Sequence, residues 1–330
     1  MKCTSLEMSL HIDETDHVAS DEFLSLDHCV VLTEKCRGFE MYRLLGRPAF
    51  VLFALHVLRA DTLCSLKKDT TVAVYAATGS GGVGENSAAW TRAFFSWFSA
   101  PNAGLVVDYV TDPKDIANYY TDGCQLATAF PSLLLWVQPG GSADNYSSSL
   151  GPDGRDNILD FATSKNGHVM GTCAGFFYSA GTYWWFDNFY PEAWMPHWFP
   201  TVEGPLSPIA VYPDYAPVQL SDGRTVMYWG GPVLGLNHTT ASVPDGATTL
   251  VSYDSPLAPP LGAAYHYKGA FVDALFNSPH PEAVAGSGIS CAPPLPPGCI
   301  TPEQQLENWR WLAAAVNSLC GTSWVIPSAL

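Results

Sequence analysis

From about residue 71 onwards, short continuous apolar runs alternate with longer amphipathic stretches. The apolar runs predict buried strands, and the amphipathic stretches predict helices. The predicted strands are 71–77, 105–110, 133–137 and 168–170, and the predicted helices between them are 87–98, 113–120 and 154–165. Apolar strands that alternate with helices are typical of a mostly parallel sheet covered on both faces. The pattern therefore predicts an α/β three-layer sandwich.

The second half of the chain is less regular. Residues 179–213 are rich in aromatic residues and proline and show weak periodicity, so no element is predicted there. Further strands are predicted at 225–228, 249–251 and 270–275. A terminal helix is expected to run from Thr301 to Leu319, because Thr301, Pro302 and Gln304 form a capping-box signature. One α/β domain over residues 66–330 accounts for all these elements.

Composition limits the classes of partner. The chain has 330 residues, of which 47% are hydrophobic, so it can bury a sizeable core. Its 15 basic and 31 acidic residues give a net charge of −16. Such a charge repels nucleic acid and anionic membranes, so neither is expected as a partner.

The segment 41–62 resembles a secretory signal peptide that starts at Met41. Arg43 and Arg47 precede an apolar run from Pro48 to Leu58, which is shorter than the roughly 20 residues that a membrane-spanning helix needs. We therefore expect a secreted or lumenal protein, with residues 1–40 as an extension that is absent from the mature chain. The alternative interpretation is a buried or interfacial helix.

Cysteines and glycosylation signals fit a secreted protein. If Cys173 is kept as a free nucleophile, five cysteines remain beyond the signal segment, so one of them stays unpaired. Cys291 and Cys299 bracket a proline-rich loop that a disulfide could close. Asn145 and Asn237 begin glycosylation sequons. No C-x-x-C pair occurs, so no structural zinc site is predicted.

The run Gly171-Thr-Cys-Ala-Gly175 follows an apolar strand and predicts a sharp turn into a helix. Glycines on both sides of Cys173 remove Cβ clashes and leave the thiol above the helix N-terminus, where backbone N–H groups favour a thiolate. Cys173 is thus the candidate nucleophile. The alternative is a buried cysteine that serves as a small core residue.

His280 and Glu282 supply the groups that a cysteine nucleophile needs. A base must take the thiol proton, and a third group must orient that base. Residues two apart on an extended segment share a face, so the imidazole and the carboxylate can meet. Candidate oxyanion donors are the backbone N–H of Ala174 and that of Gly140 or Gly141, where a substrate can approach the backbone closely.

These motifs carry a family resemblance. Residues 139–141, 171–175 and 278–282, in that order, resemble the flavodoxin-like class I glutamine amidotransferase-like fold. Within this fold, Tyr75 and the turn 230–232 make the chain similar to the biotin–protein ligase N-terminal-type domain (BPL_N-like). The resemblance covers residues 71–285. It implies Cys173 as nucleophile, His280 as base and Glu282 as its orienting residue.

The resemblance does not extend to biotin chemistry, because the ligase's catalytic domain has no counterpart here. Phe176 and Phe177 stand where glutamine-specific relatives place a glutamine residue, which argues against glutamine as the substrate. No synthase domain is encoded, so a synthase partner is not expected. The predicted function is a cysteine-dependent amide or ester hydrolase that acts on a small molecule or a peptide. A non-catalytic secreted binding domain and an amidotransferase subunit are the alternatives.

A second motif competes with this interpretation. Gly79-Ser-Gly-Gly-Val-Gly84 follows a strand and matches the dinucleotide-binding fingerprint, with Asp108 on the next strand. No later segment adds nicotinamide chemistry, and the family resemblance already accounts for a glycine-rich turn at this place. We therefore expect no cofactor and no bound metal.

Overall fold

The computed structural model describes residues 64–118, 124–185, 188–191, 194–204, 216–234, 243–254, 261–287 and 299–330, together with the backbone of three strands nearer the N-terminus. The chain divides into two compact units, residues 1–61 and 62–330. In the first unit, β1 (Leu6–Glu7), β2 (Val30–Cys36) and β3 (Phe39–Leu45) form an antiparallel sheet in the order β1-β2-β3. The predicted signal peptide overlaps β3 at residues 41–45, and its remainder lies outside the described residues.

The second unit is built on a seven-stranded sheet in the order β13-β14-β15-β7-β6-β4-β5. Its strands are β4 (Val72–Tyr75), β5 (Val107–Val110), β6 (Leu135–Gln138), β7 (His168–Thr172), β13 (Ala247–Ser252), β14 (Gly262–Lys268) and β15 (Asp273–Asn277). The five strands from β15 to β5 are parallel, and β14 and β13 extend the sheet antiparallel. The prediction of a mostly parallel α/β sheet is confirmed.

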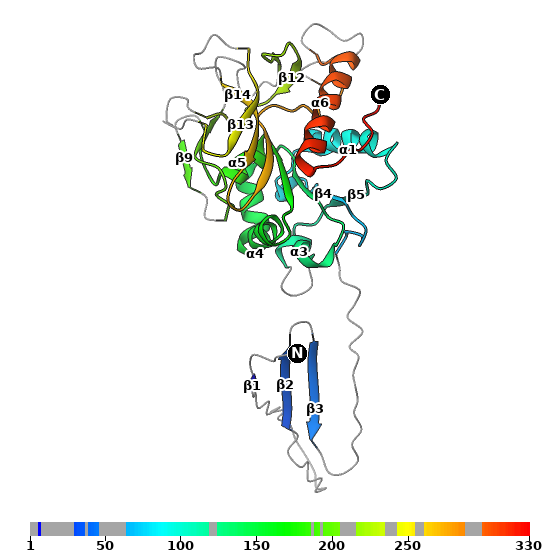
Figure 1. The fold of residues 1–330 in the computed structure, drawn as a ribbon. Helices are drawn as coiled ribbons and strands as arrows, with labels where there is room; N and C mark the ends of the chain where they lie inside the picture. Colours follow the sequence, from blue (N-terminus) through cyan, green and yellow to red (C-terminus); the bar gives the residue numbers. More distant parts are fainter. Residues whose placement is uncertain are drawn as a thin grey trace, which may run out of the picture. The chain divides into compact units, whose positions relative to one another are not determined.

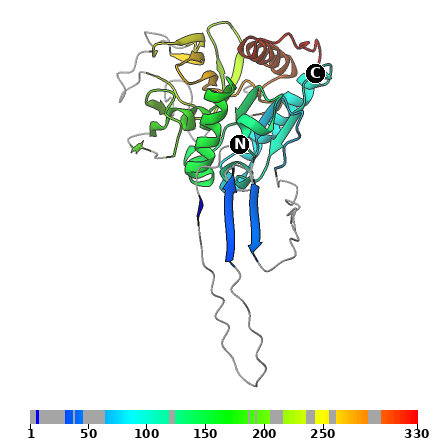
Figure 2. The ribbon, with the colours of Figure 1, turned by 60° about the horizontal axis from the view of Figure 1, so that its bottom comes forward.

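Helices cover both faces of this sheet, as Figures 1 and 2 show. The helices are α1 (Glu85–Ser99), α2 (Lys114–Ala117), α3 (Leu126–Ala129), α4 (Ala143–Ser164), α5 (Ala174–Ala180) and α6 (Pro302–Cys320). Alternate residues of β4 separate the two cores: Val72 and Val74 pack with α1 and α6, whereas Ala73 and Tyr75 pack with α2 to α5. This alternation follows from the two-residue period of a strand.

The irregular region holds two small sheets. One contains β8 (Thr182–Trp185), β9 (Asn188–Pro191) and β10 (Val202–Gly204), and the other pairs β11 (Ala216–Gln219) with β12 (Thr225–Tyr228). A short 3-10 helix, η1, covers Gly79–Gly81. Of these strands the sequence pattern predicts only β12, because the others have three or four residues and no clear apolar run or alternation.

Two elements differ from expectation for local reasons. Helix α4 begins 11 residues before its predicted start and kinks at Gly151, where φ is 59°. The Gly151-Pro152 pair reads as a turn in the sequence, so the helical residues before it are not predicted. Strand β14 is missing from the prediction because its first three residues, Gly262 to Ala264, are small and give no strand pattern. The predicted capping box at Thr301 is confirmed, with reciprocal bonds to Gln304.

Two cysteines are free among the described residues, Cys173 and Cys320. Cys64 and Cys124 form a disulfide. Cys299 is also disulfide-bonded, and Cys291 lies outside the described residues. Within the described part of the chain, no helix combines the length and the apolar character needed to cross a membrane.

Candidate active site

Cys173 lies at the turn between β7 and α5, and its backbone has φ 51° and ψ −108°. A positive φ is strained for a non-glycine residue, so the surrounding packing must hold it in place. The flanking glycines are required by close contacts. A Cβ on Gly171 would lie 2.8 Å from the Gly175 oxygen, and a Cβ on Gly175 would lie 2.0 Å from the Gln138 oxygen. The backbone N–H of Cys173 donates to the Asn277 oxygen at 2.9 Å, which ties the turn to β15.

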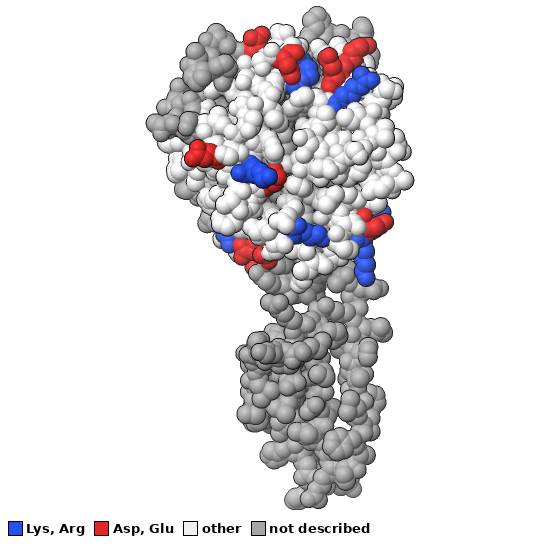
Figure 3. Space-filling view, in the orientation of Figure 1, with Lys and Arg blue, Asp and Glu red and all other residues white. Residues whose placement is uncertain are grey.

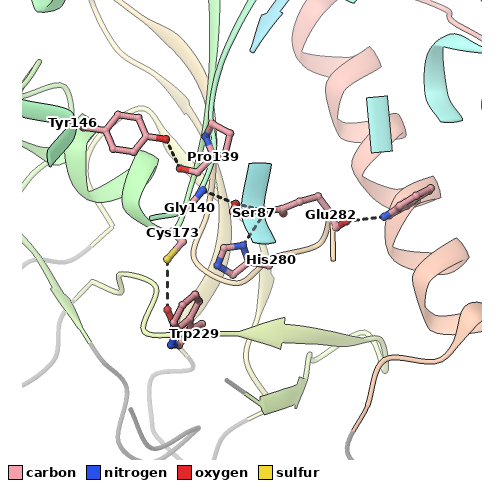
Figure 4. Close-up of polar contacts among 9 residues, drawn as sticks. Ser87, Pro139, Gly140, Tyr146, Cys173, Trp229, His280 and Glu282 are labelled. Atoms are coloured by element: carbon pink, nitrogen blue, oxygen red, sulfur yellow. Dashed lines mark hydrogen bonds and ion pairs between the residues drawn. The ribbon is translucent and has the colours of Figure 1, made fainter. Parts of the chain in front are cut away.

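The thiol of Cys173 is nearly enclosed, since the residue is only 7% exposed. Its Sγ donates a hydrogen bond to the Trp229 carbonyl oxygen at 3.5 Å (Figure 4). Trp229 follows β12 and precedes the Gly230-Gly231 turn, whose close contact with Ser278 leaves no room for a Cβ on Gly231. The turn after β12 thus forms one wall of the site.

His280 and Glu282 follow β15 and are both 1% exposed. The backbone N–H of His280 donates to the Met227 oxygen at 2.7 Å, and the edge of the Trp90 ring lies against the imidazole with centroids 5.5 Å apart. Nδ1 of His280 is 2.9 Å from Oε1 of Glu282. Nδ1–H therefore donates to the carboxylate, which leaves Nε2 to exchange a proton with another group.

Nε2 of His280 has no hydrogen-bond partner among the described residues. Burial lowers the pKa of His280, but the Glu282 carboxylate and the nearby Cys173 sulfur outweigh it and raise the pKa from 6.5 to about 10. The site thus favours an imidazolium between a carboxylate and a sulfur.

Gly140 lies close to both Cys173 and His280. A Cβ on Gly140 would be 2.4 Å from Cε1 of His280 and 3.2 Å from Cβ of Cys173. The sequence-predicted residues from three separate segments are therefore brought together in one place (Figure 4). Any side chain on Gly140 would push the imidazole and the thiol apart.

The three candidate oxyanion donors, the backbone N–H groups of Gly140, Gly141 and Ala174, differ in whether they already have an acceptor. The N–H of Gly140 donates to Oγ of Ser87 at 2.8 Å, so it is occupied, and the prediction of Gly140 as a possible oxyanion donor needs correction. The N–H groups of Gly141 and Ala174 have no acceptor in the described part of the chain. Gly141 and Ala174 therefore remain the candidate oxyanion donors.

The glycine-rich turn 79–84 packs against the Gly140-Gly141 segment. Gly84 N–H donates to the Gly140 oxygen at 2.9 Å, and Ser142 N–H donates to the Gly82 oxygen at 2.8 Å. A Cβ on Gly141 would lie 1.9 Å from the Gly82 oxygen. The glycines therefore permit close packing of two backbone segments. Asp108 accepts bonds from Lys67 and Thr70, as expected for a structural carboxylate.

Some residues of the site escape sequence reasoning. Each of four such residues contacts Cys173, His280 or Glu282, and none belongs to a recognised motif: Ser87, Trp90, Met227 and Trp229. For Ser87 alone, the sequence gives an indication of its place in the site, because it lies in the first turn of the helix that follows the glycine-rich turn. Phe176, just after the elbow, is a core residue stacked on Phe276 with centroids 4.9 Å apart.

The predicted glycosylation sites play no part in the described contacts of Cys173, His280 and Glu282. Asn145 is exposed in the first turn of α4, as a glycosylated asparagine must be, and Asn237 lies outside the described residues. Among the residues that the structure describes, no group of three or more His, Cys, Asp or Glu side chains is arranged to hold a metal ion.

No known family model matches the chain, and no curated protein matches its sequence. Solved structures show distant similarity. A structure described as a glutamine amidotransferase matches 76% of this chain and 100% of its own, with 14% identity and a TM-score of 0.44. A ThuA-like protein from Bacteroides uniformis matches 74% of this chain and 91% of its own, with 10% identity and a TM-score of 0.38. Both similarities concern the α/β fold, and identities this low do not bear on a reaction.

Proposed function

We propose that this protein is a cysteine-nucleophile hydrolase that cleaves an amide or ester through a thioester intermediate. One observation carries the proposal: His280 lies beside Cys173 with Nε2 unpartnered, while its Nδ1 binds the buried carboxylate of Glu282. In this arrangement the imidazole can take a thiol proton, and the carboxylate orients the imidazole.

In the first half of the reaction, Nε2 of His280 takes the proton of the Cys173 thiol, and Sγ attacks the substrate carbonyl carbon. The carbonyl oxygen becomes an oxyanion, which the N–H groups of Gly141 and Ala174 stabilise. His280 then gives its proton to the departing amine or alcohol as the carbon–heteroatom bond breaks. The products of this half are the free amine or alcohol and a Cys173 thioester.

In the second half, His280 takes a proton from a water molecule that attacks the thioester carbonyl. The carbon–sulfur bond breaks, the acid leaves, and Cys173 regains its proton from the imidazolium. The net reaction adds one water to one amide or ester. A correctly positioned general base contributes about 10²- to 10⁴-fold to such a rate.

We propose further that the chain belongs with the class I glutamine amidotransferase-like proteins and, within them, with the biotin–protein ligase N-terminal-type domain. The order of the Gly-Gly, Cys and His-x-Glu motifs supports this assignment. No biotin ligase activity and no synthase partner are proposed. Glutamine is not favoured as the substrate, because Phe176 fills the position after the elbow with a buried ring.

A secretory location remains part of the proposal. The Cys64–Cys124 disulfide supports it, because disulfides persist in oxidising compartments. The absence of a nucleic-acid partner is supported by the net charge of −16. On the face drawn in Figure 3, basic side chains are scattered and form no continuous area.

A non-catalytic binding domain is the second candidate, and one observation favours it. The Cys173 thiol is 7% exposed and already bonded to the Trp229 oxygen, so a substrate must displace that contact. A catalytically silent thiol could be held in the same way.

A thiol probe and an amide and ester library distinguish the two candidates. For a hydrolase, we expect iodoacetamide to label Cys173 at neutral pH faster in the folded protein than in the denatured chain, and we expect His280→Ala to abolish the difference. We also expect library hydrolysis that Cys173→Ser eliminates and Cys320→Ser, the matched change at the other free described cysteine, preserves. An inert Cys173, or hydrolysis that survives Cys173→Ser, would exclude the proposed mechanism.

A further inference from the structure

The hydroxyl of Ser87 connects three parts of the site. Ser87 lies in the first turn of α1 and is 4% exposed. Its Oγ accepts the Gly140 N–H at 2.8 Å and lies 3.3 Å from Oε1 of Glu282, to which it donates. One hydroxyl can both accept and donate, so both bonds form together.

Few other groups could replace the two hydrogen bonds of the Ser87 hydroxyl. Oε1 of Glu282 receives Ser87 on one side and Nδ1 of His280 on the other, while Oε2 has no partner among the described residues. Glu282 is buried, so water does not replace a missing donor without cost. Ser87 and His280 therefore bind the same carboxylate oxygen.

The start of α1 is also fixed to the Gly140 segment in both directions. Gly84 N–H donates to the Gly140 oxygen, and Gly140 N–H donates back to Ser87. This reciprocal pair holds Gly140 in place close to His280 and Cys173.

From this geometry we infer that Ser87 is a positioning residue of the proposed hydrolase: it orients the Glu282 carboxylate toward His280 and fixes Gly140, so that the imidazole can hold the Cys173 proton. The inference rests on the proposed function. Ser87 itself does not touch the reacting sulfur, so its effect reaches Cys173 only through Glu282, His280 and Gly140.

The test measures iodoacetamide alkylation of Cys173 by peptide mass mapping from pH 5.5 to 10.5. Ser87→Ala removes the hydroxyl, Ser87→Thr keeps it, and Ser96→Ala removes an exposed hydroxyl from the same helix as the control. Cys320 is the internal reference, because it is partly buried and its alkylation accelerates if the protein unfolds.

We expect Ser87→Ala to lower the pH 7 rate at Cys173 about tenfold, the effect of losing one hydrogen bond to a charged group. The Cys173 rate at pH 10.5, a pH above the pKa of about 8.5 of a free cysteine, and the rate at Cys320 should stay at wild-type values. Ser87→Thr and Ser96→Ala should both keep the wild-type profile.

Three outcomes would overturn the inference: an unchanged profile in Ser87→Ala, equal losses in Ser87→Ala and Ser87→Thr, or a loss accompanied by rapid alkylation of Cys320, which would make Ser87 a folding residue. A different result overturns the proposed function: wild-type Cys173 that reacts at pH 7 no faster than in the denatured chain. Failure of the proposed function is therefore visible in the wild-type profile, whereas failure of the inference about Ser87 is visible only in the variants.

Discussion

Gly140 and the imidazole of His280 are in direct contact: a Cβ on Gly140 would lie 2.4 Å from Cε1 of His280. The φ of Gly140 is not positive, so its backbone conformation does not itself require glycine. The absence of a side chain at this position is therefore a requirement of the site and not of the turn.

Gly140→Ala should reduce hydrolysis about 100-fold, because a misplacement of roughly 1 Å can cost that much. The added methyl group displaces His280 from Cys173. Gly104→Ala is the matched control, since a Cβ there meets nothing within 4 Å. Activity would be measured with the substrate that the library identifies. Equal activity in both variants would contradict the assigned place of His280.

The stability of the protein should depend on pH through His280. Its pKa in the folded protein is raised above the unfolded value of 6.5 to about 10, because Glu282 and Cys173 outweigh the effect of burial. The stabilisation from the charged imidazole is therefore fully present below about pH 6.5 and is lost as pH rises through about 10.

We expect the difference in free energy of unfolding between wild type and His280→Gln to be greatest near pH 6.5 and to narrow by pH 10.5. Urea denaturation followed by tryptophan fluorescence measures it. A difference that stays constant over this range would show that His280 does not titrate as described.

Helix α6 should lose stability when its cap is removed. Thr301→Ala removes the side chain that accepts from the Gln304 N–H and so breaks the capping box. The expected cost is about 1 kcal/mol in the free energy of unfolding. Thr301→Ser retains the hydroxyl and should restore most of it. Equal denaturation midpoints for the Ala variant and wild type would mean that water replaces the cap.

The Cys64–Cys124 disulfide should stabilise the second unit, because it closes a segment with a sequence separation of 60 residues. Chain-entropy arguments give about 4 kcal/mol for a loop of this size. We expect the double variant Cys64→Ser/Cys124→Ser to melt at a lower temperature than wild type under non-reducing conditions. An unchanged melting temperature would show that the bond adds nothing to the folded state.

Much of the central sheet could be predicted because buried parallel strands are continuous apolar runs. Strands β4 and β6 have this character, and the elbow follows from glycines on both sides of one cysteine. The contact of His280 with Glu282 was also expected, but for a different reason from the one the structure shows. The two residues lie in a turn, in which the Ala283 N–H donates to the His280 oxygen, and not on an extended segment. These relationships are local in sequence, and local patterns encode them directly.

The parts that could not be predicted depend on tertiary contacts. Ser87 and Glu282 are 195 residues apart in sequence, and nothing near either residue indicates the other. The occupied N–H of Gly140 depends on the same hydroxyl. Strand β14 has a weak pattern of its own and is held by β13 and β15 on its two sides.

The separation between Ser87 and Glu282 has a consequence for how the protein is assembled. Cys173 follows β7 and His280 follows β15, whereas Ser87 lies on α1, so a fragment that lacks α1 or β15 cannot hold these side chains together. Under the proposed function, the reactivity of Cys173 at neutral pH would then report whether folding is complete. A chain that is still being synthesised, or one that has lost α1, would carry a cysteine with the reactivity of a free thiol.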